Sequence, residues 1–157
     1  TAHWLANEYG KNVTVLEMLP HFMMGVCTAN RGHLLHYLEK SGVRLYNCTK
    51  VKALAKDGVY VEQNQSQTVP DPYNTWQPLL PPNIPNPMEK AIKEEIVEKK
   101  IPADLIVLAM GGKADETFFF EAGEEHLAKE IYNIGDSSRA GRVLEAVRGA
   151  YHLAVRI

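Results

Sequence analysis

A short apolar run at residues 12–17 constrains the fold of this chain more than any other feature. It consists mostly of β-branched and aliphatic residues and ends in an acid, Glu17. Before it, apolar residues recur at helical spacing, and Gly10 stands where a glycine commonly closes a helix. Helix, glycine, strand and terminal acid form the second half of a dinucleotide-binding βαβ unit, in which the acid binds the ribose hydroxyls. The alternative is that Glu17 is an ordinary exposed acid after a core strand.

A glycine-rich phosphate-binding loop normally precedes such an acid by about 20 residues. Counting back from Glu17 places that loop before Thr1, so we expect the sequence to be a fragment that starts inside the first helix of a nucleotide-binding domain. The backbone N–H groups that hold a pyrophosphate belong to the loop. We therefore expect the 157 residues alone to bind no dinucleotide appreciably and to be inactive.

Composition excludes several classes of function. The chain is 45% hydrophobic and 23% charged with a net charge of −2, which favours neither nucleic acid nor an anionic membrane as a partner. No apolar run reaches the roughly 18 residues of a membrane helix. Cys27 and Cys48 are too few for a disulfide framework or a structural metal site. They indicate free thiols in a reducing cytoplasm.

The next segments predict a parallel crossover. Thr28 is a suitable N-cap for a helix over residues 29–41, which Gly42 ends. Residues 43–48 then form the next strand, and strand, helix and strand with short joints give a right-handed βαβ unit. The apolar stripe expected on the helix consists of Leu34, Leu35 and Leu38.

A hairpin and a proline-rich insert follow. Residues 51–55 and 59–62 flank an Asp-Gly pair, which is a strong hairpin signal and predicts a β-meander. Residues 63–102 hold eight of the nine prolines and predict an irregular insert whose last part, residues 88–99, is a charged helix. The insert is either a docking arm or lid, or a loop packed on its own domain; we favour the second.

The last third of the chain predicts two further strands and a helix. Residues 103–110 are almost continuously apolar, as in a strand buried on both faces. Gly111 and Gly112 follow, and they either allow the backbone to approach a ligand closely or form a plain turn. A loop with three phenylalanines follows. Residues 131–134 predict the last strand, Asp136 follows it as a ligand contact or helix N-cap, and residues 139–156 predict a helix.

Together, the two strand ends resemble the pyridine nucleotide–disulfide oxidoreductase superfamily. The resemblance implies an NAD(P)H domain inserted into an FAD domain. In it, Gly111 and Gly112 mark the return to the FAD domain, and Asp136 matches the aspartate that contacts the FAD ribityl and pyrophosphate region. A helix N-terminus beside Asp136 would favour phosphate through its dipole and free N–H groups.

Residues 13–20, 30–35 and 71–78 are similar to the carboxy-terminal region of 2-enoate reductases, relatives of 2,4-dienoyl-CoA reductase and trimethylamine dehydrogenase. The resemblance covers nearly the whole chain. It implies a preceding flavin barrel with FMN and an iron–sulfur cluster. Electrons would pass from NADH through FAD and the cluster to FMN, which reduces an activated C=C bond. The barrel and its catalytic residues are outside this sequence.

The predicted fold is an α/β, Rossmann-like parallel sheet with a β-meander, truncated at the N-terminus. Residues 1–110 would be an NAD(H)-binding domain that lacks its first strand and glycine-rich loop and carries the insert at 63–102. Residues 111–157 would be the carboxy-terminal part of the FAD-binding domain. The predicted cofactor-binding residues are Glu17, Met18, Gly111, Gly112 and Asp136.

No catalytic residue and no metal site is predicted, although His33 and His36 have a chelating spacing without a third ligand. NADH is favoured over NADPH because Met18 and Leu19 follow Glu17 and no arginine is placed to accept a 2′-phosphate. The expected partner is the flavin barrel of the same polypeptide, with neither nucleic acid nor membrane. Unpaired strand edges favour a homo-oligomer. The alternatives are a docking or structural module without cofactor, or another two-dinucleotide flavoprotein reductase.

Overall fold

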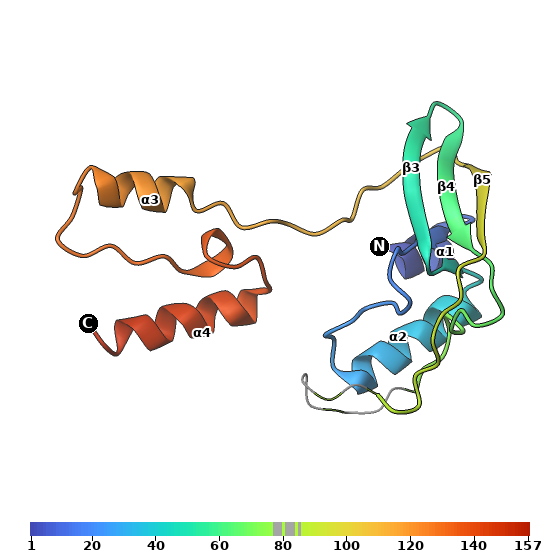
Figure 1. Cartoon of the computed structure of the whole chain (residues 1–157), viewed down its shortest axis with the longest axis horizontal. Coiled ribbons are helices and arrows are strands. Elements are labelled where there is room, and N and C mark those ends of the chain that lie inside the picture. The colour runs from blue at the N-terminus through green and yellow to red at the C-terminus, as the bar shows by residue number, and fades with distance from the viewer. Residues whose placement is uncertain (77–79, 81–83, 85) are drawn as a thin grey trace. The chain divides into compact units, whose positions relative to one another are not determined.

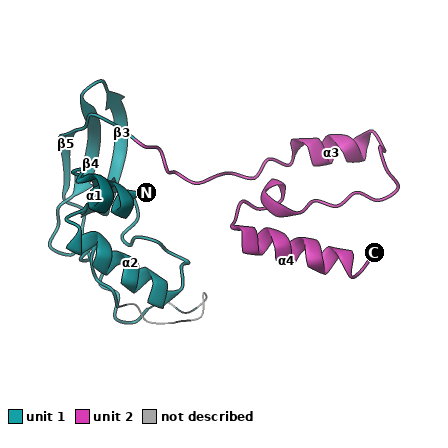
Figure 2. Ribbon diagram, turned by 180° about the vertical axis from the view of Figure 1, so that it is seen from behind, with its two compact units in different colours: residues 1–106 teal, residues 107–157 magenta. Residues whose placement is uncertain are grey.

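The computed structural model describes residues 1–76, 80, 84 and 86–157 (Figure 1). It divides into two compact units, Thr1–Ile106 and Val107–Ile157 (Figure 2). The division falls slightly before the domain boundary expected after residue 110. Four prolines of the predicted insert lie outside the described residues: Pro78, Pro81, Pro82 and Pro85.

The first unit contains the predicted crossover. Strand β1 (Thr14–Leu16) pairs in parallel with β2 (Arg44–Tyr46), and helix α2 (Thr28–Lys40) connects them. Helix α1 (Ala2–Tyr9) precedes β1 and ends at Gly10, whose φ of 58° is a left-handed conformation that glycine adopts without a Cβ clash. The strand, helix, strand order and the closing glycine are therefore confirmed. The N-cap of α2 is Cys27 and not Thr28.

One hydrophobic core joins these elements. Its buried members are Phe22, Leu35, Leu38, Val43 and Leu45, and apolar residues of α1 and β1 pack against them. The buried face of α2 is formed by Arg31, Leu35 and Leu38, at positions i, i+4 and i+7. Leu34 was expected in this stripe but is 40% exposed, because it lies one position off that face.

The meander is an antiparallel sheet in the order β3-β4-β5. Strands β3 (Thr49–Ala55) and β4 (Gly58–Asn64) form the predicted hairpin, and β5 (Ile96–Pro102) pairs with the other side of β4. The helix predicted over residues 88–99 is therefore wrong. Pairing along the whole of β4 overrides the helix propensity of the lysines and glutamates in β5. The ends of the predicted insert thus belong to the sheet.

Gly58 begins β4 where the strand approaches β5 closely. An alanine Cβ at this position would overlap the carbonyl oxygen of Ile101 and lie 3.0 Å from the Cα of Pro102. We expect Gly58→Ala to lower the free energy of unfolding by about 1–3 kcal/mol, as overpacking does, because backbone atoms must move. Urea unfolding followed by circular dichroism measures the loss.

The matched control for this prediction is Gly123→Ala. Its added methyl group would meet no atom within 4 Å, and its helical site favours alanine. We expect it to leave the unfolding midpoint unchanged or to raise it. Equal unfolding midpoints for the wild-type protein and Gly58→Ala would show that β5 can shift away from the added methyl group without a loss of stability, which would contradict the prediction.

The second unit contains helix α3 (Thr117–Glu124), the 3-10 turn η1 (Gly135–Ser137) and helix α4 (Val143–Ala154). The three phenylalanines lie in α3 and not in a loop. The strands expected over residues 103–110 and 131–134 do not form, since neither segment pairs with another strand among the described residues. An apolar run becomes a buried strand only beside a pairing neighbour, and Met110 is 86% exposed here.

Candidate functional site

Glu17 lies directly after β1, at the carboxyl end of the parallel pair. Its N–H donates to the carbonyl of Tyr46 (2.9 Å), and its own carbonyl accepts from the N–H of Thr49 (2.9 Å). These bonds fix the Glu17 backbone between β2 and β3. Glu17 as a residue is half-buried, and its Oε1 accepts a hydrogen bond from the Leu19 N–H (2.9 Å). The predicted ribose ligand therefore stands at the edge where ligands of parallel sheets bind.

The loop from residue 18 to residue 26 leaves this edge and returns to α2. Phe22 anchors it in the core, whereas Met18 is 68% exposed. Met23 and Gly25 both have positive φ angles, 55° and 79°, which turn the chain back toward the helix. The loop therefore has a defined path although it contains no regular secondary structure.

Two buried polar side chains near this loop were not predicted. The Arg31 Nε donates to the carbonyl of Phe22 (2.9 Å), and the Asn47 Nδ2 donates to the carbonyl of Pro20 (2.7 Å). The sequence contains a signal for Arg31, because its spacing from Leu35 and Leu38 places it on the buried face of α2. Asn47 carries no comparable signal, since it stands at the end of a strand.

Gly111, Gly112 and Asp136 all belong to the second unit. A Cβ on Gly112 would lie 3.8 Å from the Cβ of Ala140, so the glycine pair lies beside the loop that follows Asp136. Gly111 has a φ of 76°, which favours glycine at that turn. The second unit therefore contains these three predicted residues, while Glu17 and Met18 belong to the first.

The start of α4 differs from the expected open helix N-terminus. The Gly141 N–H donates to Asp136 Oδ1 (3.2 Å), and the Arg142 N–H donates to Glu145 Oε2 (3.1 Å). Asp136 thus lies in η1 and anchors the preceding loop, and the N-cap of α4 is Arg142. The hydrogen bond and ion pair with Arg142 lower the pKa of Glu145 to about 2. Two of the N–H groups that were expected to face a phosphate are already bonded.

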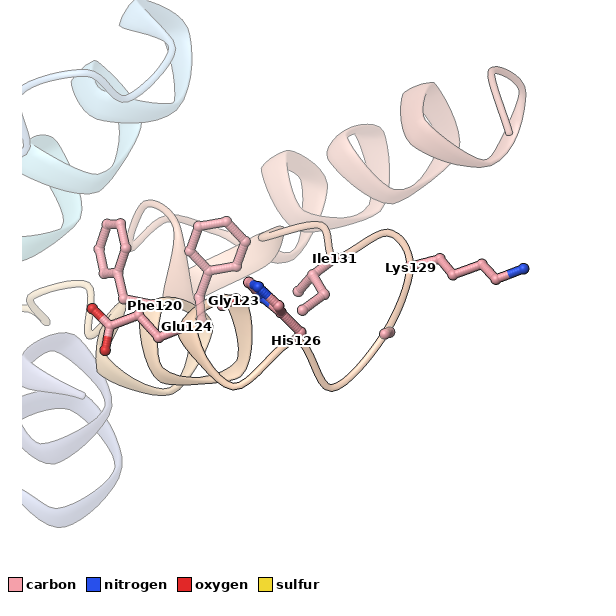
Figure 3. A pocket seen from close by; sticks show the side chains of 8 residues that line it. Phe120, Gly123, Glu124, His126, Lys129 and Ile131 are labelled. Carbon is pink, nitrogen blue, oxygen red and sulfur yellow. Dashed lines mark hydrogen bonds between the residues drawn. The ribbon is translucent and has the colours of Figure 1, made fainter.

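A hollow of about 490 Å³ lies beside α3 (Figure 3). Eight residues line it: Phe119, Phe120, Gly123, Glu124, His126, Ala128, Lys129 and Ile131. His126 is one of these lining residues, with its Nδ1 2.8 Å from the Gly123 carbonyl oxygen, and Lys129 points outward in the figure. None of the five predicted cofactor-binding residues lines this hollow.

Other classes of site find no support in the described part of the chain. No group of three or more histidine, cysteine or acidic side chains in it could hold a metal ion. His33 and His36 instead contact the ring of Tyr37, with ring centroids 6.0 and 5.9 Å away. None of the helices described is long and apolar enough to cross a membrane.

Comparison with known proteins identifies the family. The family model described as pyridine nucleotide-disulphide oxidoreductase matches residues 1–148. A solved structure of 2-naphthoyl-CoA reductase in complex with 2-naphthoyl-CoA is similar, at 24% sequence identity and a TM-score of 0.67. The similarity covers 99% of this chain but 19% of the reductase chain. No curated protein sequence matched the chain.

These matches confirm the predicted α/β fold class, with its parallel pair and antiparallel meander. The family model covers most of the sequence, from the first helix into α4. The chain therefore belongs to the pyridine nucleotide-disulphide oxidoreductase family, whose members are oxidoreductases that bind FAD and a pyridine nucleotide.

Proposed function

We propose that this chain is the NADH- and FAD-binding part of a flavin-dependent reductase that acts on an activated C=C bond. The observation that carries the proposal is Glu17, a half-buried acidic residue at the carboxyl end of a parallel strand within a βαβ unit. The similarity to 2-naphthoyl-CoA reductase agrees with the resemblance to 2-enoate reductases. The chain spans about a fifth of that reductase, so the remaining parts would lie elsewhere in a longer polypeptide.

The residues around Glu17 fit the adenosine ribose of NADH. A carboxylate accepts hydrogen bonds from neighbouring hydroxyls, and the Leu19 N–H uses only one of the two Glu17 oxygens within the described residues. The 2′-phosphate of NADPH would require a positive charge at the site, and Met18 and Leu19 bring none. Glu17 would therefore bind the ribose and select NADH over NADPH.

The residues of the second unit fit FAD. Gly111 and Gly112 present backbone without side chains, and Asp136 presents an exposed carboxylate in the same unit. Asp136 would bind the ribityl and pyrophosphate region, and the glycines would allow close approach. When bound, NADH would supply a hydride and FAD would accept its two electrons. The residues of this chain bind and orient these groups.

The test uses the complete polypeptide purified without oxygen. We expect acid-released flavin to contain both FAD and FMN, and NADH to bleach the flavin absorbance faster than NADPH does. An α,β-unsaturated carboxylate should then reoxidise the flavin, while its saturated counterpart, the control, should not. A protein without FAD, or a flavin that NADH leaves oxidised, contradicts the proposal and favours a docking module.

A further inference from the structure

Two buried polar side chains join the loop after Glu17 to the proline-rich insert. Arg31 on α2 is 3% exposed and donates from Nε to Phe22 and from Nη1 to the carbonyl of Asn74 (3.1 Å). Asn47 after β2 is 5% exposed and donates from Nδ2 to Pro20 and to the carbonyl of Pro70 (2.9 Å). Each side chain thus holds one carbonyl of the loop and one of the insert.

The insert is fixed beside these contacts by a third side chain. The Tyr73 hydroxyl donates to the carbonyl of Val43 (2.7 Å) and accepts from the N–H of Leu45 (3.2 Å). It thereby satisfies backbone groups of β2 and its entry that a neighbouring strand would otherwise pair with. Residues 70–74 are consequently a fixed surface and not a free arm, as expected for a loop packed on its own domain.

Within the described residues, the Arg31 guanidinium donates to two backbone carbonyl groups, those of Phe22 and Asn74. None of the ion pairs among the described residues includes Arg31, and burial lowers the pKa of its guanidinium. A buried charge needs hydrogen bonds from its surroundings, so losing either carbonyl would be costly. The loop and the insert therefore depend on each other for their positions.

We propose that Arg31 and Asn47 are positioning residues for NADH: they fasten residues 18–22 to the insert and so set the path of the chain beside Glu17. The inference rests on the proposed function, because it assumes that Glu17 binds the ribose. It assigns the insert a role at the nucleotide site, in which residues 70–74 form the support for the loop.

The test compares two buried asparagines that fasten opposite ends of the insert. Asn47→Asp removes both donated hydrogen bonds without changing the side chain's size. Asn64→Asp is the matched control: Asn64 is 8% exposed, its Nδ2 donates to the carbonyl of Lys93 (2.7 Å), and among the described residues its side chain has no hydrogen bond to residues 18–22. Both variants are made in the complete polypeptide, and NADH binding, kcat, FAD content and melting temperature are measured.

We expect Asn47→Asp to weaken NADH binding about tenfold, since losing one or two net hydrogen bonds corresponds to that factor, with kcat and FAD content retained. Asn64→Asp should lower the melting temperature and leave NADH binding unchanged. Arg31→Lys, which can donate to one segment but does not reproduce the guanidinium fork, should weaken NADH binding less than Arg31→Met. The two Arg31 variants also test the positioning role if Asn47→Asp does not fold.

Unchanged NADH binding in Asn47→Asp and Arg31→Met, or equal losses in Asn47→Asp and Asn64→Asp, would overturn the positioning role. Glu17→Ala separates this from failure of the proposed function. If Glu17→Ala weakens NADH and the Asn47 and Arg31 variants do not, only the positioning inference fails. If Glu17→Ala also leaves NADH binding unchanged, the ribose assignment fails and the inference fails with it.

Discussion

Replacing Glu17 by alanine in the complete polypeptide is expected to weaken NADH binding roughly ten- to hundredfold. The lost interaction is a hydrogen bond to a charged group, which contributes about 1.5–3 kcal/mol, and each 1.4 kcal/mol is about a tenfold change in affinity. The Michaelis constant for NADH should rise while the FAD content stays the same. Steady-state kinetics with varied NADH measures the change, and an equilibrium titration separates binding from turnover.

Two further variants make the Glu17 prediction specific. Glu17→Gln keeps an oxygen that can accept from the Leu19 N–H (2.9 Å) but loses the charge. Its Michaelis constant for NADH should therefore lie between those of the wild-type enzyme and Glu17→Ala. Glu39→Ala removes an exposed acid from α2 in the same unit and should leave NADH kinetics unchanged. An unaltered Michaelis constant in Glu17→Ala would remove Glu17 from the nucleotide site.

Local sequence signals predicted the structure correctly where a few adjacent residues determine it. Gly10 ends α1 in a left-handed conformation, and the Asp-Gly signal correctly marks the hairpin, in which Lys56 and Asp57 form the turn and Gly58 begins β4. The crossover from β1 through α2 to β2 also followed from short-range hydrophobic spacing. These features depend on backbone geometry and side-chain burial within one element or its immediate neighbour.

Pairing between strands far apart in the sequence explains why some secondary-structure predictions were wrong. β5 alternates too weakly to stand out from a charged helix, and it is a strand because β4 offers a partner more than 30 residues earlier in the chain. Residues 103–110 show the reverse case: their composition fits a buried strand, but no described strand pairs with them. A hydrophobic pattern specifies what a segment prefers to bury, and the neighbours decide whether it does so.

The candidate site was predictable to the extent that it lies at strand ends. Glu17 could be placed because it directly follows an apolar run, and the structure puts it at the carboxyl end of β1. Arg31 and Asn47 were missed because their importance comes from backbone carbonyls of distant loops. A charged residue on an otherwise apolar helix face was the available signal, and it distinguishes Arg31 from the exposed charges of α2.

Replacing Asp136 by alanine is expected to weaken FAD retention in the complete polypeptide by roughly ten- to hundredfold, while FMN stays bound. The variant loses a carboxylate that would bind FAD and also the acceptor that holds the Gly141 N–H (3.2 Å) beside Gly112 and Ala140. Acid release of the flavins followed by chromatography gives the FAD:FMN ratio, and dialysis against FAD-free buffer measures the rate of loss.

Matched variants can separate the two expected functions of Asp136, which are to bind FAD and to anchor the loop through the Gly141 N–H. Asp136→Asn retains an oxygen for the Gly141 N–H, so a loss of FAD in this variant would come from the missing charge. Asp115→Ala is the control, since Asp115 is another exposed acid of the second unit and accepts a backbone N–H, that of Thr117 (3.0 Å). It should shorten or loosen the start of α3 and leave the FAD:FMN ratio unchanged. If Asp136→Ala keeps the wild-type ratio through dialysis, Asp136 serves only to anchor the loop before α4, and FAD must bind through other residues.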